Sequence, residues 1–159
     1  MRQIPEIING RQIFYMDLDC GLQVFEDFPL KNWVLVVVAD DLGHPLLNVF
    51  SELCIDKDVI YVCAAGEVAS ELDDLFDGIM VLRGIYKEYK PSWHRTEEDV
   101  LMTTWHSSTE DAFWFATTLA RYDEIQIDTV LVANFTFHKL FEPISQLASA
   151  INKGYLPSD

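Results

Sequence analysis

The chain is poor in basic residues. Of its 159 residues, 11 are lysine or arginine and 26 are aspartate or glutamate, so the formal net charge is −15 at pH 7. Proteins bind DNA and RNA largely by neutralising phosphates with lysine and arginine. A strongly anionic molecule repels such ligands. This shortage of positive charge therefore predicts that nucleic acid is not a partner.

Cysteine and long hydrophobic runs are also scarce. The three cysteines, Cys20, Cys54 and Cys63, lack the two-residue spacing of zinc and redox motifs, and Cys54 and Cys63 lie in apolar runs typical of buried thiols. The longest apolar run, Trp33–Ala39, is far shorter than the roughly 18 residues of a membrane span, and the N-terminus does not resemble a signal peptide. These absences predict a soluble, cytoplasmic protein that does not contact membranes.

Motifs for nucleotide binding and hydrolysis are missing. The chain contains no G-x-G-x-x-G, G-x-x-x-x-G-K-[ST], H-E-x-x-H or G-x-S-x-G. Gly66 follows a predicted strand, but Glu67 then occupies the helix start where a phosphate would bind. The four histidines show no metal-ligand spacing. We therefore expect no cofactor and no bound metal.

Half of the residues are apolar, and many of them form short buried strands that alternate with amphipathic helices. Continuous apolar runs predict central strands covered on both faces, at Trp33–Ala39, Val59–Ala64 and Ile127–Ala133. Helical spacing predicts helices from Pro45 to Cys54, from Val68 to Ile79, after the overlapping capping boxes at Ser107 and Ser108, and from Pro143 to a C-cap at Gly154. This alternation predicts an α/β fold, a single three-layer sandwich in which helices cover both faces of a mostly parallel sheet of about five strands.

Three other segments have weaker patterns. Ile79–Leu82 follows Gly78 and suggests a further strand, and Val100–Trp105 suggests another. Arg83–Arg95 carries a net charge of +3 with interleaved aromatic residues, and Pro91 argues against regular structure there. We interpret this segment as a surface loop bonded to the protein's own carboxylates.

The N-terminal thirty residues are expected to be peripheral. Within them, Ile13–Met16 has the composition of an edge strand or of one arm of a hairpin. No composition shift, repeat or linker divides the chain. Residues 1–159 are therefore predicted to form a single domain.

Polar residues at the ends of the predicted strands form one candidate site. In open parallel sheets, ligands bind outside the carboxyl ends of the strands. The residues expected there are Asp40, Asp41, Gly66, Glu67, Trp105, His106 and Asn134. Asp40, Asp41 and His106 are the candidates for metal-assisted or acid–base catalysis, and the others would complete the pocket. The alternative is that the two aspartates cap a helix and that His106 only packs in a loop.

The negative charge is concentrated in the first half of the chain. Residues 1–80 hold 15 acidic and four basic residues, a net charge of −11, against −4 for residues 81–159. The densest predicted anionic surface is one helix face, which carries Glu67, Glu71, Asp73, Asp74 and Asp77. Such a face speeds the encounter with a basic protein and adds specificity.

This charge distribution favours a non-enzymatic function. We expect an acidic protein-binding protein, whose most specific form is an immunity- or antitoxin-type inhibitor of a basic toxin domain. The alternative is an enzyme with a small-molecule or divalent-metal site at the carboxyl ends of the strands.

Three adjacent aromatic residues, Phe113–Phe115, lie on one predicted helix and cannot all face the core. We assign Phe115 to the core and expect Phe113 or Trp114 to point outward. Exposed aromatics near Trp114 would then allow two copies of the chain to associate.

Two short motifs resemble a known family. Val62-Cys63-Ala64-Ala65-Gly66 precedes an acidic helix, and Thr103-Thr104-Trp105-His106 precedes a capped aromatic helix. Together they resemble an uncharacterised family of small bacterial proteins, a domain of unknown function. The resemblance implies no activity or cofactor, and it points to Gly66, Trp105 and His106 as one neighbourhood. Positions 65–69 depart from the bulkier, more polar stretch that the family leads us to expect.

Overall fold

The computed structural model describes residues 1–18, 21–87, 89–96 and 99–157. Cys20 and Glu88 lie outside this part of the chain. The elements within it are β1 (Arg2–Ile8), β2 (Arg11–Asp17), α1 (Gln23–Asp27), β3 (Trp33–Val38), α2 (Leu47–Asp56), β4 (Tyr61–Ala65), α3 (Ala69–Lys87), β5 (Met102–Trp105), α4 (Thr109–Thr118), β6 (Thr129–Asn134) and α5 (Phe141–Asn152).

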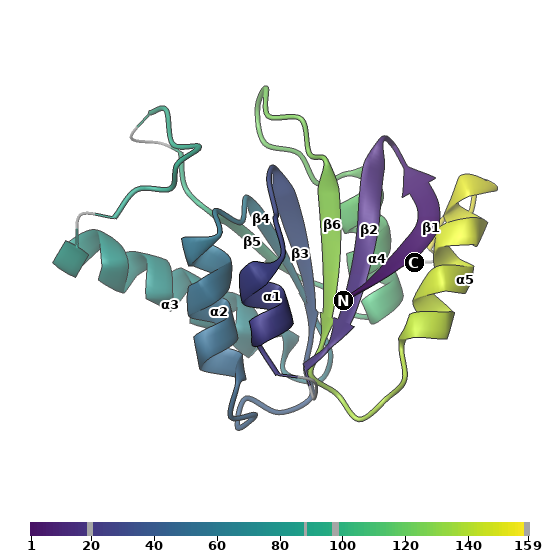
Figure 1. Cartoon of the computed structure of the whole chain (residues 1–159), viewed down its shortest axis with the longest axis horizontal. Coiled ribbons are helices and arrows are strands. Elements are labelled where there is room, and N and C mark those ends of the chain that lie inside the picture. The colour runs from purple at the N-terminus through teal and green to yellow at the C-terminus, as the bar shows by residue number, and fades with distance from the viewer. Residues whose placement is uncertain (19–20, 88, 97–98, 158–159) are drawn as a thin grey trace.

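The strands form one sheet in the order β1-β2-β6-β3-β4-β5 (Figure 1). Every neighbouring pair is parallel except β1 and β2, which are antiparallel. The predicted α/β fold with a mostly parallel sheet is confirmed, with six strands in the described chain instead of about five. The additional strand is β1, whose pairing register shifts between Ile4 and Ile7, where Pro5 interrupts the strand pattern.

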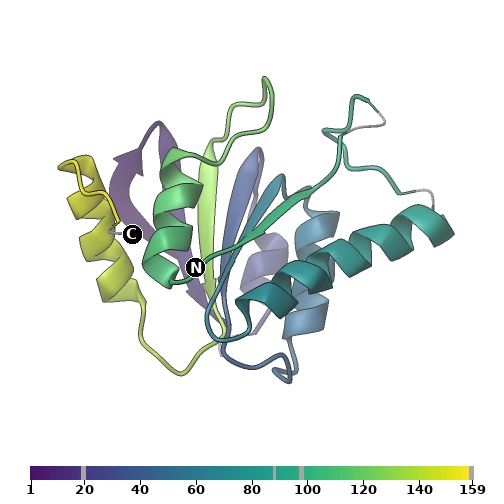
Figure 2. The ribbon, with the colours of Figure 1, turned by 180° about the vertical axis from the view of Figure 1, so that it is seen from behind.

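Helices cover both faces of the sheet. One core cluster joins α1, α2 and α3 to side chains such as Trp33 and Leu35, and the other joins α4 and α5 to side chains such as Val34 and Val36. Figure 2 shows the face covered by α4 and α5. Successive residues of β3 thus enter opposite cores, which explains why its apolar run has no alternation.

Residues 2–17 form the strands β1 and β2 at one edge of the sheet. Asn9 and Gly10 connect β1 to β2 with φ values of 51° and 78°, as the two central residues of a type I′ hairpin turn require. The hairpin that we considered is therefore present. The assignment of Ile13–Met16 to an edge strand is wrong, because β2 lies between β1 and β6 and the edge is β1.

The prediction of a strand at Ile79–Leu82 is wrong. Helix α3 continues through Gly78 and Gly84 to Lys87, so the loop predicted for Arg83–Arg95 begins only after this helix. Burial recurs along α3 at Leu72, Phe76, Ile79 and Arg83, which keeps the helical period beyond the glycine.

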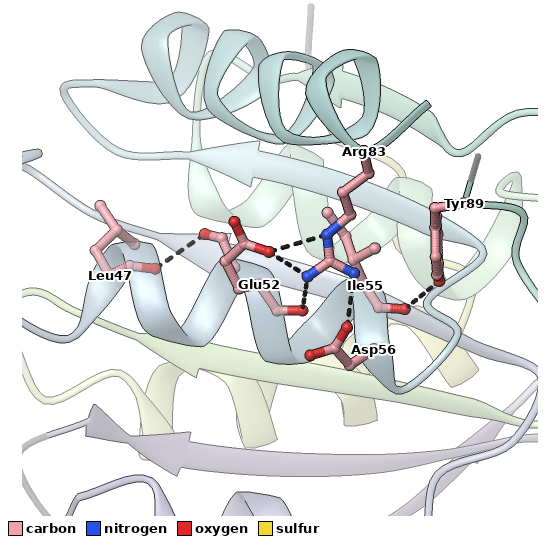
Figure 3. A network of polar contacts seen from close by, with 7 residues as sticks. Leu47, Glu52, Ile55, Asp56, Arg83 and Tyr89 are labelled. Atoms are coloured by element: carbon pink, nitrogen blue, oxygen red, sulfur yellow. Dashed lines mark hydrogen bonds and ion pairs between the residues drawn. The ribbon is translucent and has the colours of Figure 1, made fainter. Parts of the chain in front are cut away.

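Arg83 fixes this second half of α3 to α2 (Figure 3). Its guanidinium donates to the carboxylate of Glu52, to Asp56 Oδ1 at 2.6 Å and to the backbone carbonyl of Glu52 at 3.1 Å. Tyr89 adds a hydrogen bond of 2.8 Å to the carbonyl of Ile55. The segment is thus bonded to the protein's own carboxylates, as predicted, but through a helix.

The aromatic residues of α4 differ from the prediction. Phe113 is fully buried, so the expectation that it could point outward is wrong, while Trp114 and Phe115 are half-buried. Ala112 and Ala116 bring the helix close to the sheet and enclose the Phe113 ring in the same core. Association of two copies near Trp114 stays a prediction.

Several local predictions are confirmed. Ser108 caps α4 by accepting a hydrogen bond from Asp111 N, and Gly154 follows α5 with a φ of +93°. Cys54 and Cys63 are buried and form no disulfide. Among the helices of the described chain, none combines the length and the apolar character needed to cross a bilayer.

Candidate functional site

The two strand-end aspartates serve local backbone contacts. Asp40 Oδ1 accepts a hydrogen bond of 3.1 Å from the backbone N–H of Glu67, ahead of α3. Asp41 Oδ1 accepts one of 2.8 Å from the N–H of Gly43, two residues later. Asp40 therefore helps to cap the start of α3, as the structural alternative proposed, and its Oδ2 also lies 3.9 Å from His138 Nε2.

His106 lies in a separate group of contacts. Its Nδ1 is 2.9 Å from Asp111 Oδ2, and its Nε2 is 3.0 Å from Thr104 Oγ1. A carboxylate, an imidazole and a hydroxyl follow one another here in the order used by hydrolases. However, the imidazole side chain is only 8% exposed and packs on Phe115. These contacts anchor the first turn of α4 to β5.

The strand-end residues do not assemble into one site. Asp40 follows β3 and His106 follows β5, with β4 between them, so their backbones are separated by two strand spacings, roughly 10 Å. Trp105 is 60% exposed, whereas Asn134 is 2% exposed and lies on the far side of β3. Only the general location, the carboxyl edge of the sheet, is common to all of them.

Gly66 has a role in the backbone. It follows β4 with a φ of +99°, and a Cβ atom at this position would lie 2.1 Å from the carbonyl oxygen of Ala39. The glycine is therefore required by the close approach of the β4 end to the β3 end.

The described residues offer no cluster for a metal ion. Within them, no group of three or more histidine, cysteine, aspartate or glutamate side chains is arranged to hold one. A divalent-metal site made from Asp40, Asp41 and Glu67 therefore has no geometric support in this part of the chain.

The acidic residues of α3 do form a surface. Glu67, Glu71, Asp74 and Asp77 are exposed, and Asp73 is half-buried. Burial raises the pKa of Asp73, and the nearby carboxylates of Asp77 and Asp74 raise it further, against the opposing contact with Thr103. The exposed carboxylates therefore form an anionic surface over the first half of α3.

The same exposed side of α3 becomes apolar after Gly78. Val81, Leu82, Ile85 and Tyr86 are between 56% and 78% exposed. At 100° per residue, Val81, Leu82 and Ile85 lie on the same side of the helix as Glu71 and Asp74, and Tyr86 lies at the margin of that side. We call this set of exposed residues the α3 stripe; its members are Glu67, Glu71, Asp74, Asp77, Val81, Leu82, Ile85 and Tyr86. It is carboxylate-rich at one end and apolar at the other.

A groove borders the apolar end of the α3 stripe. It encloses about 860 Å³ between α3, residues 89–94, residues 99–100 and the start of β5. Val81 lines it from the helix, and Val100 and Met102, which are 53% and 40% exposed, line it from the other side. Strand β5 is the last of the sheet, so one of its edges has no neighbouring strand in the described chain.

Sequence reasoning missed the apolar half of this surface. The signal was present: had the helix been continued past Gly78, the positions 67, 71, 74, 78, 81 and 85 would have shown a single face at helical spacing. Assigning Ile79–Leu82 to a strand placed its alternate residues in the core instead.

The chain was also compared with known proteins. Residues 13–151 match the model of a family described as a domain of unknown function (DUF7684). This match covers most of the chain and confirms the resemblance to an uncharacterised family. No curated protein matches the chain.

Proposed function

We propose that this chain, which belongs to the DUF7684 family, binds a basic protein through the α3 stripe and strand β5. The description of the family assigns it no activity. The observation that carries the proposal is the stripe itself, in which exposed carboxylates and exposed apolar side chains share one side of a 19-residue helix. At 1.5 Å per residue, this helix is about 28 Å long, enough to span a protein interface of ordinary size.

The acidic end of the stripe favours a cationic partner. Placing lysine or arginine beside Asp74 and Asp77 would offset the repulsion that these two carboxylates exert on each other and on Asp73. Charge complementarity of this kind accelerates association and selects against wrong partners.

The apolar end supplies the area that an interface core needs. Ile85 and Tyr86 are 67% and 78% exposed on the helix, and Val100 is 53% exposed beside the start of β5. Aromatic and aliphatic side chains contribute most of the binding energy at the centre of interfaces, while charged groups surround them. The partner surface should therefore combine apolar and basic residues.

A toxin domain neutralised by this protein is the most specific form of the proposal, and a cytoplasmic setting is part of it. The buried, unpaired thiols of Cys54 and Cys63 support a reducing compartment. Whether the partner is a toxin domain is tested by identifying the captured protein.

Affinity capture with matched variants tests the proposal. The full chain carrying a tag is expressed in its source cell and recovered at low and at moderate salt, alongside Glu71→Gln/Asp74→Asn and Val81→Ser/Ile85→Ser. We expect one basic protein to be retained by the wild-type chain, and each double variant to weaken its purified complex by about tenfold or more.

The controls alter the same chemistry elsewhere. Glu26→Gln/Glu124→Gln removes two exposed carboxylates away from α3, and Leu156→Ser removes an apolar side chain that is 71% exposed near the C-terminus. A partner that binds all variants equally well would be bound by non-specific charge attraction, and this result would contradict the proposal. So would the recovery of no basic protein at low salt.

A further inference from the structure

A second cavity, apart from the groove beside α3, lies at the carboxyl ends of β2 and β6. The loops after β2 and β3 lead to α1 and α2 on one face, whereas the loop after β6, the strand between them, leads to α5 on the opposite face. Figure 1 shows the β3–α2 and β6–α5 loops diverging at the lower end of the sheet. Open α/β sheets bind ligands where neighbouring connections separate in this way. A cavity of about 470 Å³ is present here, within the range of small-molecule sites.

Hydrogen bonds hold the floor of this cavity in place. Asn134 Nδ2, at the end of β6, lies 3.1 Å from Tyr15 Oη and 2.9 Å from Asp17 Oδ1, and Tyr15 Oη donates to Asp17 Oδ1 at 2.6 Å. On its other side, Asn134 Oδ1 accepts hydrogen bonds from the N–H and the hydroxyl of Thr136. The cavity wall is therefore formed before any ligand arrives.

The charged side chains that line this cavity have no net formal charge, although the molecule as a whole is strongly anionic. Arg2 and Lys139 line it, together with His44 and His138. The guanidinium carbon of Arg2 lies 3.4 Å from the ring centroid of Phe141 and 5.5 Å from that of Tyr15. Across the described residues, Arg2 has no carboxylate within ion-pair distance. Stacking on rings holds the guanidinium while its N–H groups remain available in the ring-parallel plane.

The remaining lining restricts the charge of a ligand. Asp17 and Glu142 share the cavity with the basic groups, so a doubly charged phosphate would meet more repulsion than a singly charged carboxylate. Phe135, Phe137 and Phe141 line the cavity, but Phe135 is only 8% exposed and the guanidinium of Arg2 covers one face of Phe141. Phe137 is fully exposed at the rim, and an aromatic ligand would pack against it.

We propose that this cavity binds a small aromatic carboxylate, with the carboxylate on Arg2 and Lys139 and the ring against Phe137. The cavity is separate from the α3 stripe, so this proposal can be tested independently of the protein-binding proposal. Bidentate pairing with a guanidinium is the strongest hydrogen-bonding arrangement available to a carboxylate here.

Ligand-observed NMR and calorimetry on the full chain, tagged at the C-terminus, test this site. The probes are phenylacetate, its neutral amide phenylacetamide, and phenyl phosphate. We expect phenylacetate to bind in preference to both, and Arg2→Gln to weaken its binding by at least about tenfold, the value of a charge-assisted pair. Lys153→Gln, a change on the solvent-exposed end of α5 outside this cavity, should leave binding unchanged.

Four results would overturn the inference. Equal binding of phenylacetate and the amide would show that the cavity does not recognise the carboxylate charge. Tighter binding of phenyl phosphate would replace the carboxylate class. No binding of phenylacetate to a folded wild-type chain, or equal binding to Arg2→Gln, would exclude the site.

Discussion

At the scale of single residues, the polar and glycine positions at the strand ends hold the backbone in place. Gly66 allows the end of β4 to pass against the carbonyl of Ala39, Asp40 caps the start of α3, and Asn134 bridges β6 to β2. Each of them was a candidate for ligand binding from sequence. Only Asn134 lies in the wall of a cavity that we describe.

The role of Gly66 predicts a large loss of stability on substitution. Gly66→Ala combines a left-handed φ with a Cβ atom 2.1 Å from Ala39 O, so we expect the free energy of unfolding to fall by at least about 3 kcal/mol. Gly10→Ala is the matched control, because Gly10 has a φ of +78° but no heavy atom within 4 Å of the added carbon. It should lose only about 1–2 kcal/mol in urea denaturation. Equal losses would show that strain in φ, and not the clash, limits position 66.

At the scale of elements, α3 is the helix that most shapes the molecule. Its buried side joins the core and Arg83 bonds it to α2, while its exposed side carries the α3 stripe. Asp73 lies between these sides: Asp73 Oδ1 is shielded from solvent and has no hydrogen-bond partner among the described residues. We therefore expect the ionised carboxylate of Asp73 to oppose folding.

The raised pKa of Asp73 predicts a pH-dependent gain from its removal. The pKa of Asp73 is higher in the folded chain than in the unfolded chain. Below the ordinary pKa of 3.8 the carboxyl group is protonated in both states and does not lower the free energy of unfolding. As the pH rises through the folded pKa, the free energy of unfolding falls. Asp73→Asn should therefore raise the melting temperature at pH 7, with a smaller gain near pH 4.

Glu26→Gln controls for the loss of one negative charge from an exposed position. Thermal melts of both variants across pH 4–7 separate the two effects. A gain from Asp73→Asn that is no larger than that from Glu26→Gln, or that does not change with pH, would contradict the account of Asp73.

At the scale of the whole molecule, a net charge of −15 opposes compact folding through self-repulsion. Salt screens this repulsion, since the Debye length falls from about 10 Å at 0.1 M to about 3 Å at 1 M. We expect sodium chloride to raise the melting temperature at pH 7, and to have little effect near the sequence pI of 4.4. A salt effect of equal size at both pH values would indicate a general solvent effect instead of charge repulsion.

Features that depend on neighbouring residues could be predicted from the amino-acid sequence alone. Trp33–Ala39 was identified as a central strand because both of its faces are apolar, and the cap at Ser108 was identified from its spacing to Asp111. The acidic side of α3 was identified from the helical period. These patterns are local, because side-chain direction repeats every two residues in a strand and every 3.6 in a helix.

Features that depend on contacts between distant segments could not be predicted in this way. Ile79–Leu82 is helical because β5 occupies the place beside β4 and Arg83 bonds to α2, neither of which the local composition reveals. The order of the strands places β4 between Asp40 and His106, and it brings Arg2 of β1 to the cavity at the end of β6. Strand order and helix length result from contacts between segments far apart in the chain. For that reason, the strand-end residues predicted to share one site take part in separate contacts.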